Sequence, residues 1–287
     1  VRSSAASDVY KRQQTVHDIS VYTNWEKASI EQGFAEENKL FYILTNSRGF
    51  TAAQTEKAHK EIAEVVDQVA KETGKEYLFI SRSDSTLRGH YPLETTILKD
   101  EYEKNTGKKI DGEVLCPFFK EGGRFTIDDV HYVQYDDTLV PAAETEFAKD
   151  KTFGYTVSNL KEYVEEKTQG AYKKENVTAI SLENIRELNY DKIEEQLLAV
   201  EDFNKVIVNA IDYVDVKIFC VALFRAMKKG KNFMFRTAAA IVKVMGAVTD
   251  QPLLTREQMV VKETTNGGIV VVGSHTEKTT KQVECLK

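Results

Sequence analysis

Short apolar runs alternate with helix-like segments along most of this chain. The runs have the length and the β-branched or aromatic content of buried strands, and the segments between them carry apolar residues at helical spacing. This alternation is typical of a mainly parallel sheet that is covered by helices on both faces. We therefore predict an α/β fold with a Rossmann-like three-layer arrangement, right-handed crossovers and one inserted mixed segment.

The individual elements follow from the same pattern. Strands are expected over 40–44, 77–80, 112–116, 177–181, 205–208, 232–235 and 268–272. Helices are expected over 52–72, which Gly74 ends, over 92–103, with Pro92 in the first turn, and over 191–200, 213–228 and 238–244. Ser274 is expected to cap a final helix, and residues 118–172 form the inserted segment.

The chain is expected to have three parts. Residues 1–14 show no periodicity and no turn that leads into a strand, so we interpret them as a non-native or disordered leader. A domain is expected over 15–248. Residues 249–268 contain a proline and a glycine pair, so we expect 249–287 to be a linker and the start of a second, incomplete domain.

The composition argues against several classes of protein. The 287-residue chain has a formal net charge of −6, whereas proteins that bind nucleic acids need a basic face. No apolar run approaches the roughly 20 residues of a membrane helix. Cys116, Cys220 and Cys285 are far apart and lack metal-ligand spacing, which predicts free thiols, a cytoplasmic location and no metal site. We expect no nucleic-acid partner and no membrane partner.

Polar side chains follow three of the predicted strands at the points where the strands end. Arg48 follows 40–44, the segment SRSDSTLRG follows 77–80, and Arg236 with Thr237 follows 232–235. Because the carboxyl ends of parallel strands meet at one edge, these arginines and hydroxyl residues should line one crevice. Arginine binds carboxylate or phosphate in two charge-assisted hydrogen bonds, so we predict a site for a small, hydroxylated anion. The candidates within SRSDSTLRG are Arg82, Ser83, Asp84, Ser85, Thr86, Arg88 and Gly89.

Each of these residues also has a plainer interpretation. An arginine after a strand can simply solvate the edge of the sheet. Asp84 can cap the following helix or form an Asx turn. Gly89 is expected to permit a backbone angle or a close approach that a side chain would block.

The inserted segment gathers charged residues around the pair Gly122–Gly123. These residues are Glu121, Arg124, Asp128, Asp129 and His131. They could belong to a loop that closes over a site, but a surface hairpin is the interpretation we favour. His131 and His90 are expected to be packing or surface histidines.

Residues 267–282 read as a strand, a Gly-Ser turn and a helix. Backbone N–H groups at the start of a helix favour phosphate, which makes Gly273 and Ser274 candidates for nucleotide binding. The pattern is neither a Walker A sequence nor a GxGxxG sequence, so an ordinary strand–helix turn remains the favoured alternative.

At several of these motifs the chain resembles the four-carbon acid sugar kinases, also called the hydroxyacid kinase family. The blocks occur in the family's order, and SDSTxRG is the most specific of them. They are SDSTLRGHYPLE (83–94), PFFKEGGRFTIDDVHYV (117–133), LVPAAETEFAKDKTFGY (139–155), VNAIDYVDVKIF (208–219), FMFRTAAA (233–240), PLLTRE (252–257) and VVVGSHTEKTTKQ (270–282).

The resemblance implies an N-terminal domain that binds the acid sugar, over 15–248, and a C-terminal domain that binds ATP. It implies phosphorylation of a hydroxyl of threonate, erythronate or an oxo derivative, with ATP and Mg²⁺ as cofactors. Carried over residue by residue, it makes Asp84, Ser85, Arg88 and Gly89 substrate-site residues, joined by Arg48, Ser83 and Arg236.

Two departures from the family pattern affect this prediction. The family's opening DDxTGA-like motif is missing, and the chain stops before the GGDTA-like motif of the ATP domain. We therefore expect a chain truncated at both ends, mostly the substrate-binding part of a kinase, which could be inactive alone.

In the predicted reaction, Asp84 orients the acceptor hydroxyl or accepts its proton, and arginines hold the carboxylate or the phosphoryl group. A non-catalytic module that binds a hydroxy acid is the alternative. A dehydrogenase is disfavoured because no strand leads into GxGxxG, and a scaffold has no reason to gather arginines at strand ends. A homo-oligomer is possible.

Overall fold

The computed structural model describes residues 15–252, 255, 257, 271–272 and 277–286. The chain divides into two units, Val1–Asp250 and Gln251–Lys287. This boundary lies inside 249–268, the segment that was expected to separate two domains. The functional assignment of the two parts stays a prediction.

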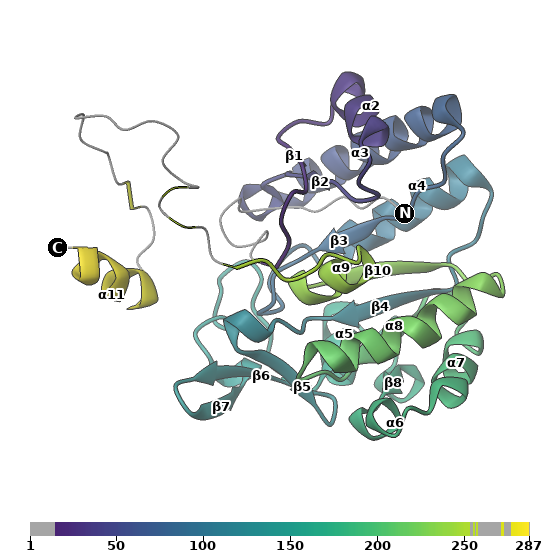
Figure 1. The fold of residues 1–287 in the computed structure, drawn as a ribbon. Coiled ribbons are helices and arrows are strands. Elements are labelled where there is room, and N and C mark those ends of the chain that lie inside the picture. Colours follow the sequence, from purple (N-terminus) through teal and green to yellow (C-terminus); the bar gives the residue numbers. More distant parts are fainter. Residues whose placement is uncertain (1–14, 253–254, 256, 258–270, 273–276, 287) are drawn as a thin grey trace, which may run out of the picture. The chain divides into compact units, whose positions relative to one another are not determined.

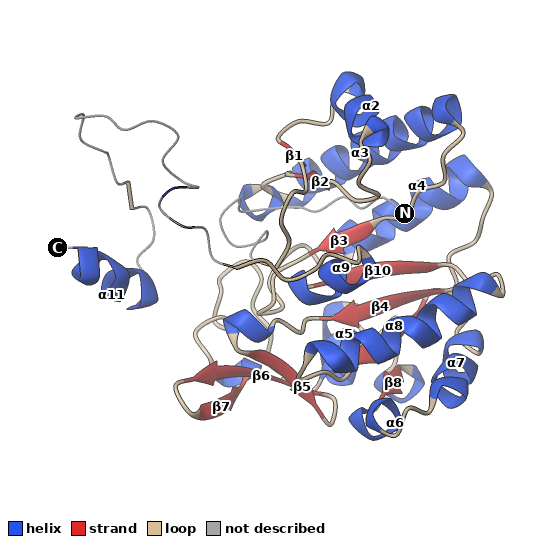
Figure 2. Ribbon diagram, in the orientation of Figure 1, coloured by secondary structure: helices blue, strands red, loops and turns tan. Residues whose placement is uncertain are grey.

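The centre of the first unit is a five-stranded sheet in which all neighbouring strands are parallel (Figures 1 and 2). Its order is β3 (Ile80–Arg82), β10 (Phe233–Thr237), β4 (Gly112–Cys116), β9 (Asn204–Val208) and β8 (Thr178–Ile180). Strand β10 lies between β3 and β4, although it comes last in the sequence. The carboxyl ends of two strands about 150 residues apart therefore lie side by side.

Helices cover both faces of this sheet, which confirms the predicted α/β fold (Figure 2). Val114 and Phe235 pack against the apolar residues of α7, α8 and α9 on one face. Leu115 and Met234 face the other way, towards residues of α3, α4 and α5. The helices of the first unit are α2 (Lys27–Ala35), α3 (Ala52–Thr73), α4 (Leu93–Thr106), α5 (Leu160–Lys167), α6 (Leu182–Arg186), α7 (Tyr190–Leu198), α8 (Tyr213–Lys228) and α9 (Ala239–Met245).

Helix α3 shows how local sequence sets these elements. Thr51 and Gln54 form a capping box at its N-terminus, and Gly74 ends it in the left-handed conformation with φ 61°. Ile62 and Val66 lie one turn apart on its buried face. The predicted start of this helix and its closure by Gly74 are confirmed.

A second, two-stranded sheet pairs β1 (Val21–Tyr22) with β2 (Tyr42–Ile43) in parallel. Strand β2 is shorter than the predicted 40–44. Short 3-10 turns also occur at η1 (Ser47–Gly49), η2 (Lys120–Gly122), η3 (Ala142–Glu144) and η4 (Lys174–Asn176).

The inserted segment folds mainly as an antiparallel sheet of β5 (Arg124–Ile127), β6 (Val130–Tyr135) and β7 (Thr138–Pro141). Asp128 and Asp129 both have positive φ and join β5 to β6 as a two-residue hairpin turn. The predicted hairpin is confirmed, but its position on the surface was wrong in part, because Thr126 and His131 are fully buried. Thr126 of β5 bridges to Ala210, two residues beyond β9, so this sheet lies past the carboxyl end of β9.

The predicted bounds of two strands were wrong. Strand β3 covers Ile80–Arg82 instead of 77–80, and β10 covers Phe233–Thr237 instead of 232–235. Most of the predicted strand 268–272 lies outside the described residues, as does Ser274, while Val271 and Val272 are described and are not in a strand. The second unit contains helix α11 (Glu277–Leu286). No helix among the described residues combines the length and the apolar character needed to cross a bilayer.

Candidate functional site

Two neighbouring strands carry buried arginines near their carboxyl ends. Arg82 of β3 and Arg236 of β10 are each 4% exposed. The prediction that they follow the strands was wrong, because β10 pairs with β3 as far as Thr237 and includes both the arginine and the threonine. Neither side chain solvates the sheet edge.

Asp84 lies at the centre of a cluster of arginines. Arg48 Nη2 and Arg88 Nε each lie 2.8 Å from Asp84 Oδ2. The hydroxyl of Thr86 donates a hydrogen bond to the same oxygen. Arg48 belongs to η1, after β2, whereas Asp84 and Arg88 follow β3. The cluster therefore joins two of the three predicted strand ends, and the third, that of β10, lies beside β3.

The surrounding charges keep Asp84 ionised. Burial opposes its ionisation, but the guanidinium groups of Arg88 and Arg48 and the hydrogen bond from Thr86 outweigh burial, and they hold the pKa of Asp84 well below its usual range. An efficient general base has a pKa near the operating pH. The geometry therefore suits Asp84 to holding two arginines, and the catalytic role of Asp84 stays a prediction.

The inserted segment completes the rim of this cluster. Arg88 Nη1 lies 3.8 Å from Asp150 Oδ2. The guanidinium carbons of Arg88 and Arg124 lie 4.9 and 5.5 Å from the centre of the Phe147 ring. The sequence predicted Arg124 in a surface hairpin and indicated no role in the site for Phe147 or Asp150. These contacts form only when the insertion folds back on the 81–89 loop.

Arg236 holds the backbone of the same loop. Its Nη2 donates a hydrogen bond to the Leu87 carbonyl at 3.1 Å, and the hydroxyl of Tyr163 donates to the same oxygen at 2.7 Å. Leu87 has φ 66° and Gly89 has φ 132°. The expectation that Gly89 permits an unusual backbone angle is confirmed, because side-chain-bearing residues rarely adopt this region.

Further contacts fix the start of the loop from the inside. The N–H and the hydroxyl of Ser83 both donate to the Thr237 carbonyl, at 2.9 and 3.4 Å.

His131 is fully buried, with Nε2 2.8 Å from the Ser85 carbonyl and Nδ1 3.0 Å from Thr126 Oγ1. Burial lowers the pKa of His131 to about 4. It is a packing histidine, as predicted.

The acidic residues of the insertion serve other contacts. The carboxylate of Glu121 accepts a hydrogen bond from Tyr213, and Asp129 pairs with Lys161 at 2.9 Å. Asp128 lies in the hairpin turn. Gly273 and Ser274, the candidates for nucleotide binding, lie outside the described residues.

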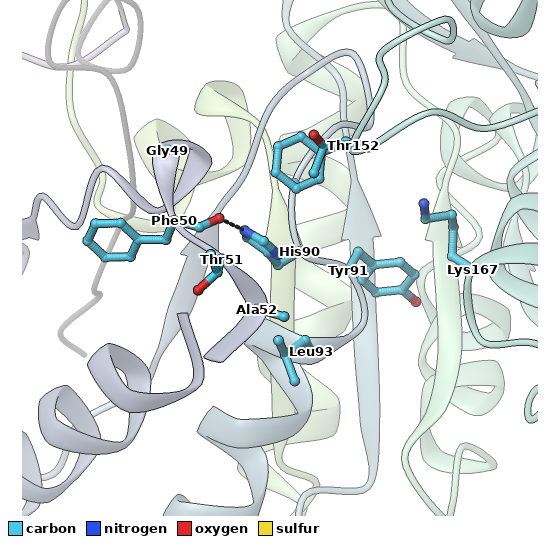
Figure 3. Close-up of a pocket in the computed structure, with 11 residues that line it drawn as sticks. Gly49, Phe50, Thr51, Ala52, His90, Tyr91, Leu93, Thr152 and Lys167 are labelled. Carbon is cyan, nitrogen blue, oxygen red and sulfur yellow. Dashed lines mark hydrogen bonds between the residues drawn. The ribbon is translucent and has the colours of Figure 1, made fainter. Parts of the chain in front are cut away.

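A cleft of about 540 Å³ is lined by residues that neighbour the arginine cluster in the sequence (Figure 3). Gly49 and Gly89 follow Arg48 and Arg88, and Thr152 lies two residues after Asp150. Neither the arginines nor any carboxylate are among the lining residues. In Figure 3, His90 points towards the Phe50 carbonyl, at 2.9 Å. The lining residues are Gly49, Phe50, Thr51, Ala52, Gly89, His90, Tyr91, Leu93, Thr152, Phe153 and Lys167.

The sequence matches the family profile described as a sugar-binding N-terminal domain, over residues 6–245. The chain belongs to this family. It is a sugar-binding domain of the four-carbon acid sugar kinases, so the resemblance at SDSTLRG and the other motifs is confirmed.

Solved structures share the fold of this sugar-binding domain at low sequence identity. A Bordetella bronchiseptica protein of family DUF1537, solved with bound citrate as a domain-swapped dimer, is 18% identical with a TM-score of 0.60, over 85% of this chain. A Haemophilus influenzae protein of that family is 15% identical with a TM-score of 0.53, over 80%. A Salmonella typhimurium protein described as a putative tRNA synthase is 11% identical with a TM-score of 0.54, over 86%.

The sugar-binding domain spans 55% of the length of each of these three structures. Among curated proteins, none matches it.

Proposed function

We propose that this chain binds a four-carbon acid sugar, namely threonate, erythronate or an oxo derivative, as the substrate-binding part of an ATP-dependent kinase. One observation carries the proposal: Gly49 and Gly89, the residues next to Arg48 and Arg88, line a cleft that no carboxylate lines. The ligand carboxylate would bind at Arg48 and Arg88, and the hydroxyls would extend into the cleft.

The arginines around Asp84 support an anionic ligand. Arg48 and Arg88 each pair with Asp84, and Arg88 Nη1 also lies 3.8 Å from Asp150 Oδ2. The side chains of Arg48 and Arg88 are 28% and 19% exposed, so a ligand can reach them. A carboxylate on a planar guanidinium makes strong, charge-assisted hydrogen bonds.

The cleft supports a ligand with hydroxyl groups. Its lining includes the side chains of Thr51, Thr152 and Lys167 and the rings of Phe153 and Tyr91. Its volume lies within the range of pockets that hold small ligands and leaves space beyond a four-carbon chain. The citrate in the Bordetella bronchiseptica structure is a hydroxy acid, which agrees with a ligand of this class.

The kinase reaction itself remains part of the proposal. Phosphoryl transfer depends mostly on positioning and charge stabilisation, and arginines that fix the carboxylate would leave a hydroxyl free to react. ATP would bind with the phosphates near Gly273 and Ser274. Among the described residues, no group of three or more His, Cys, Asp or Glu side chains could hold a metal ion, and the use of Mg²⁺ stays part of the proposal. A homo-oligomer and a cytoplasmic location also stay predictions.

A non-catalytic module that binds a hydroxy acid is the second candidate. It is favoured by the fact that the described site needs only a carboxylate and hydroxyls from its ligand. Turnover of Mg-ATP in the presence of threonate would support the kinase over this candidate.

Calorimetric titration with threonate and erythronate tests the proposal. We expect one site per chain, and we expect Arg88→Ala to weaken binding by about tenfold or more, because a charge-assisted hydrogen bond is lost. Arg225→Ala is the matched control, since Arg225 is 46% exposed and its nearest carboxylate, that of Asp191 at 3.2 Å, is fully exposed. Arg225 also lies 4.0 Å from Glu194, a longer contact than the 3.2 Å between Arg186 and the buried Asp215. Equal effects of Arg88→Ala and Arg225→Ala would contradict the site.

A further inference from the structure

A buried ion pair lies between two strands of the central sheet. Glu113 of β4 and Lys205 of β9 are partners in register, and Lys205 Nζ lies 2.8 Å from Glu113 Oε2. Both side chains are fully buried. The ammonium group also lies 3.4 Å from the centre of the Phe203 ring and 4.1 Å from that of Tyr172.

The stability of the fold alone does not explain this pair. Removing two charges from water is costly, and replacing a buried ion pair by apolar residues of similar size is often neutral or stabilising. Glu113 Oε1 has no hydrogen-bond partner among the described residues, so the carboxylate is not fully satisfied by its neighbours. A role in holding another group is the better explanation.

The group that Glu113 holds is Tyr91. The hydroxyl of Tyr91 donates a hydrogen bond to Glu113 Oε2 at 3.2 Å, and Tyr91 lines the cleft. Its ring stacks on Tyr163, with ring centres 5.7 Å apart at 13°, and the Arg236 guanidinium lies 4.6 Å from the ring centre. Tyr163 and Arg236 in turn donate hydrogen bonds to the Leu87 carbonyl. Both ends of the 87–91 segment therefore depend on one buried network.

We propose that the Glu113–Lys205 pair is a positioning device for the ligand site. It fixes the Tyr91 hydroxyl and, through Tyr91, Tyr163 and Arg236, the 87–91 segment that carries Arg88 and borders the cleft. The effect on ligand affinity rests on the proposed function, whereas the effect on the segment does not.

Two variants remove the device in different ways. Tyr91→Phe removes the hydroxyl and keeps the ring. Glu113→Leu combined with Lys205→Met removes both charges together and leaves no unpaired buried charge. We expect either variant to weaken threonate binding by about fivefold to tenfold and to speed amide exchange over 87–91, with exchange over β5 to β7 unchanged. Combining Tyr91→Phe with Glu113→Leu and Lys205→Met should lower the threonate affinity little further, because both variants remove the same Tyr91–Glu113 contact.

Controls separate positioning from general loosening. Tyr172→Phe removes the hydroxyl of a ring that packs on the Lys205 ammonium and leaves Tyr91 unchanged, so it should leave binding and exchange unchanged. The double variant Glu113→Gln with Lys205→Met keeps an acceptor for the Tyr91 hydroxyl. We expect it to bind threonate more tightly than Glu113→Leu with Lys205→Met.

The proposal would be overturned if Tyr91→Phe kept the threonate affinity and the amide exchange of the parent. It would also be overturned if the losses of affinity in Tyr91→Phe and in the apolar double variant were fully additive. If the apolar double variant fails to fold, Tyr91→Phe alone decides. If the parent binds no acid sugar, the proposed function fails, and amide exchange over 87–91 still decides the positioning role.

Discussion

At Asp84, one carboxylate meets two guanidinium groups and a hydroxyl, and this single residue organises the predicted site. SDSTLRG predicted the residue types of an anion site, because hydroxyls, a carboxylate and arginines follow an apolar run. It could not predict that Asp84 pairs with two arginines. That outcome depends on Arg48, which lies in η1, after a strand of the separate two-stranded sheet.

His131 makes stability depend on pH. Burial holds its folded pKa at about 4, below the 6.5 of an exposed histidine. Because the folded pKa is depressed, His131 contributes stability that is fully present above about pH 6.5 and is lost as the pH falls towards 4. The full contribution is on the order of 3 kcal/mol.

We expect the melting temperature of the parent to fall between pH 7 and 4.5, and His131→Gln to show a shallower fall. His17→Gln, at a partly exposed histidine, is the control. Thermal unfolding across this pH range is the measurement, and equal slopes for the parent and His131→Gln would contradict the assignment.

At the scale of elements, the sequence correctly predicted helices and strands whose ends are marked by nearby residues, such as a helix cap. Strand β4 and helix α8 lie where they were predicted, the helix with Asp212 at its capping box. The ends of β3 and β10 were misjudged because arginine normally marks a strand end, whereas Arg236 is buried against Tyr163 and the Leu87 carbonyl. Those partners lie about 70 and 150 residues away, beyond the reach of any local pattern.

The loop after β3 depends on Gly89. Its φ of 132° strains any residue with a side chain, although an added Cβ would meet no atom closer than 3.9 Å. We expect Gly89→Ala to lower the free energy of unfolding by about 1–3 kcal/mol and to weaken threonate binding through displacement of Arg88. Gly49→Ala is the matched control, since it lines the same cleft in open space at an ordinary backbone angle. Denaturant unfolding that gives the same loss for both variants would contradict this account.

At the scale of the molecule, the order of the sheet places β10 next to β3, so that Arg236 can hold the loop that carries Asp84 and Arg88. A parallel sheet was predictable from alternation, but this order was not, because no local signal tells which strands become neighbours. The insertion then adds Arg124, Phe147 and Asp150 from beyond the carboxyl ends. The resemblance at SDSTLRG correctly indicated the family, while the geometry explains why its residues gather.

The central claim is that a ligand carboxylate binds at the arginine cluster. The most direct test is calorimetric titration of the parent chain with threonate and with threitol, which keeps the four carbons and replaces the carboxylate by an alcohol. We predict that threonate binds at one site and that threitol binds at least about a hundredfold more weakly, because the charge-assisted bonds to Arg48 and Arg88 are lost. Equal binding of the two, or no binding of threonate or erythronate, would contradict the account.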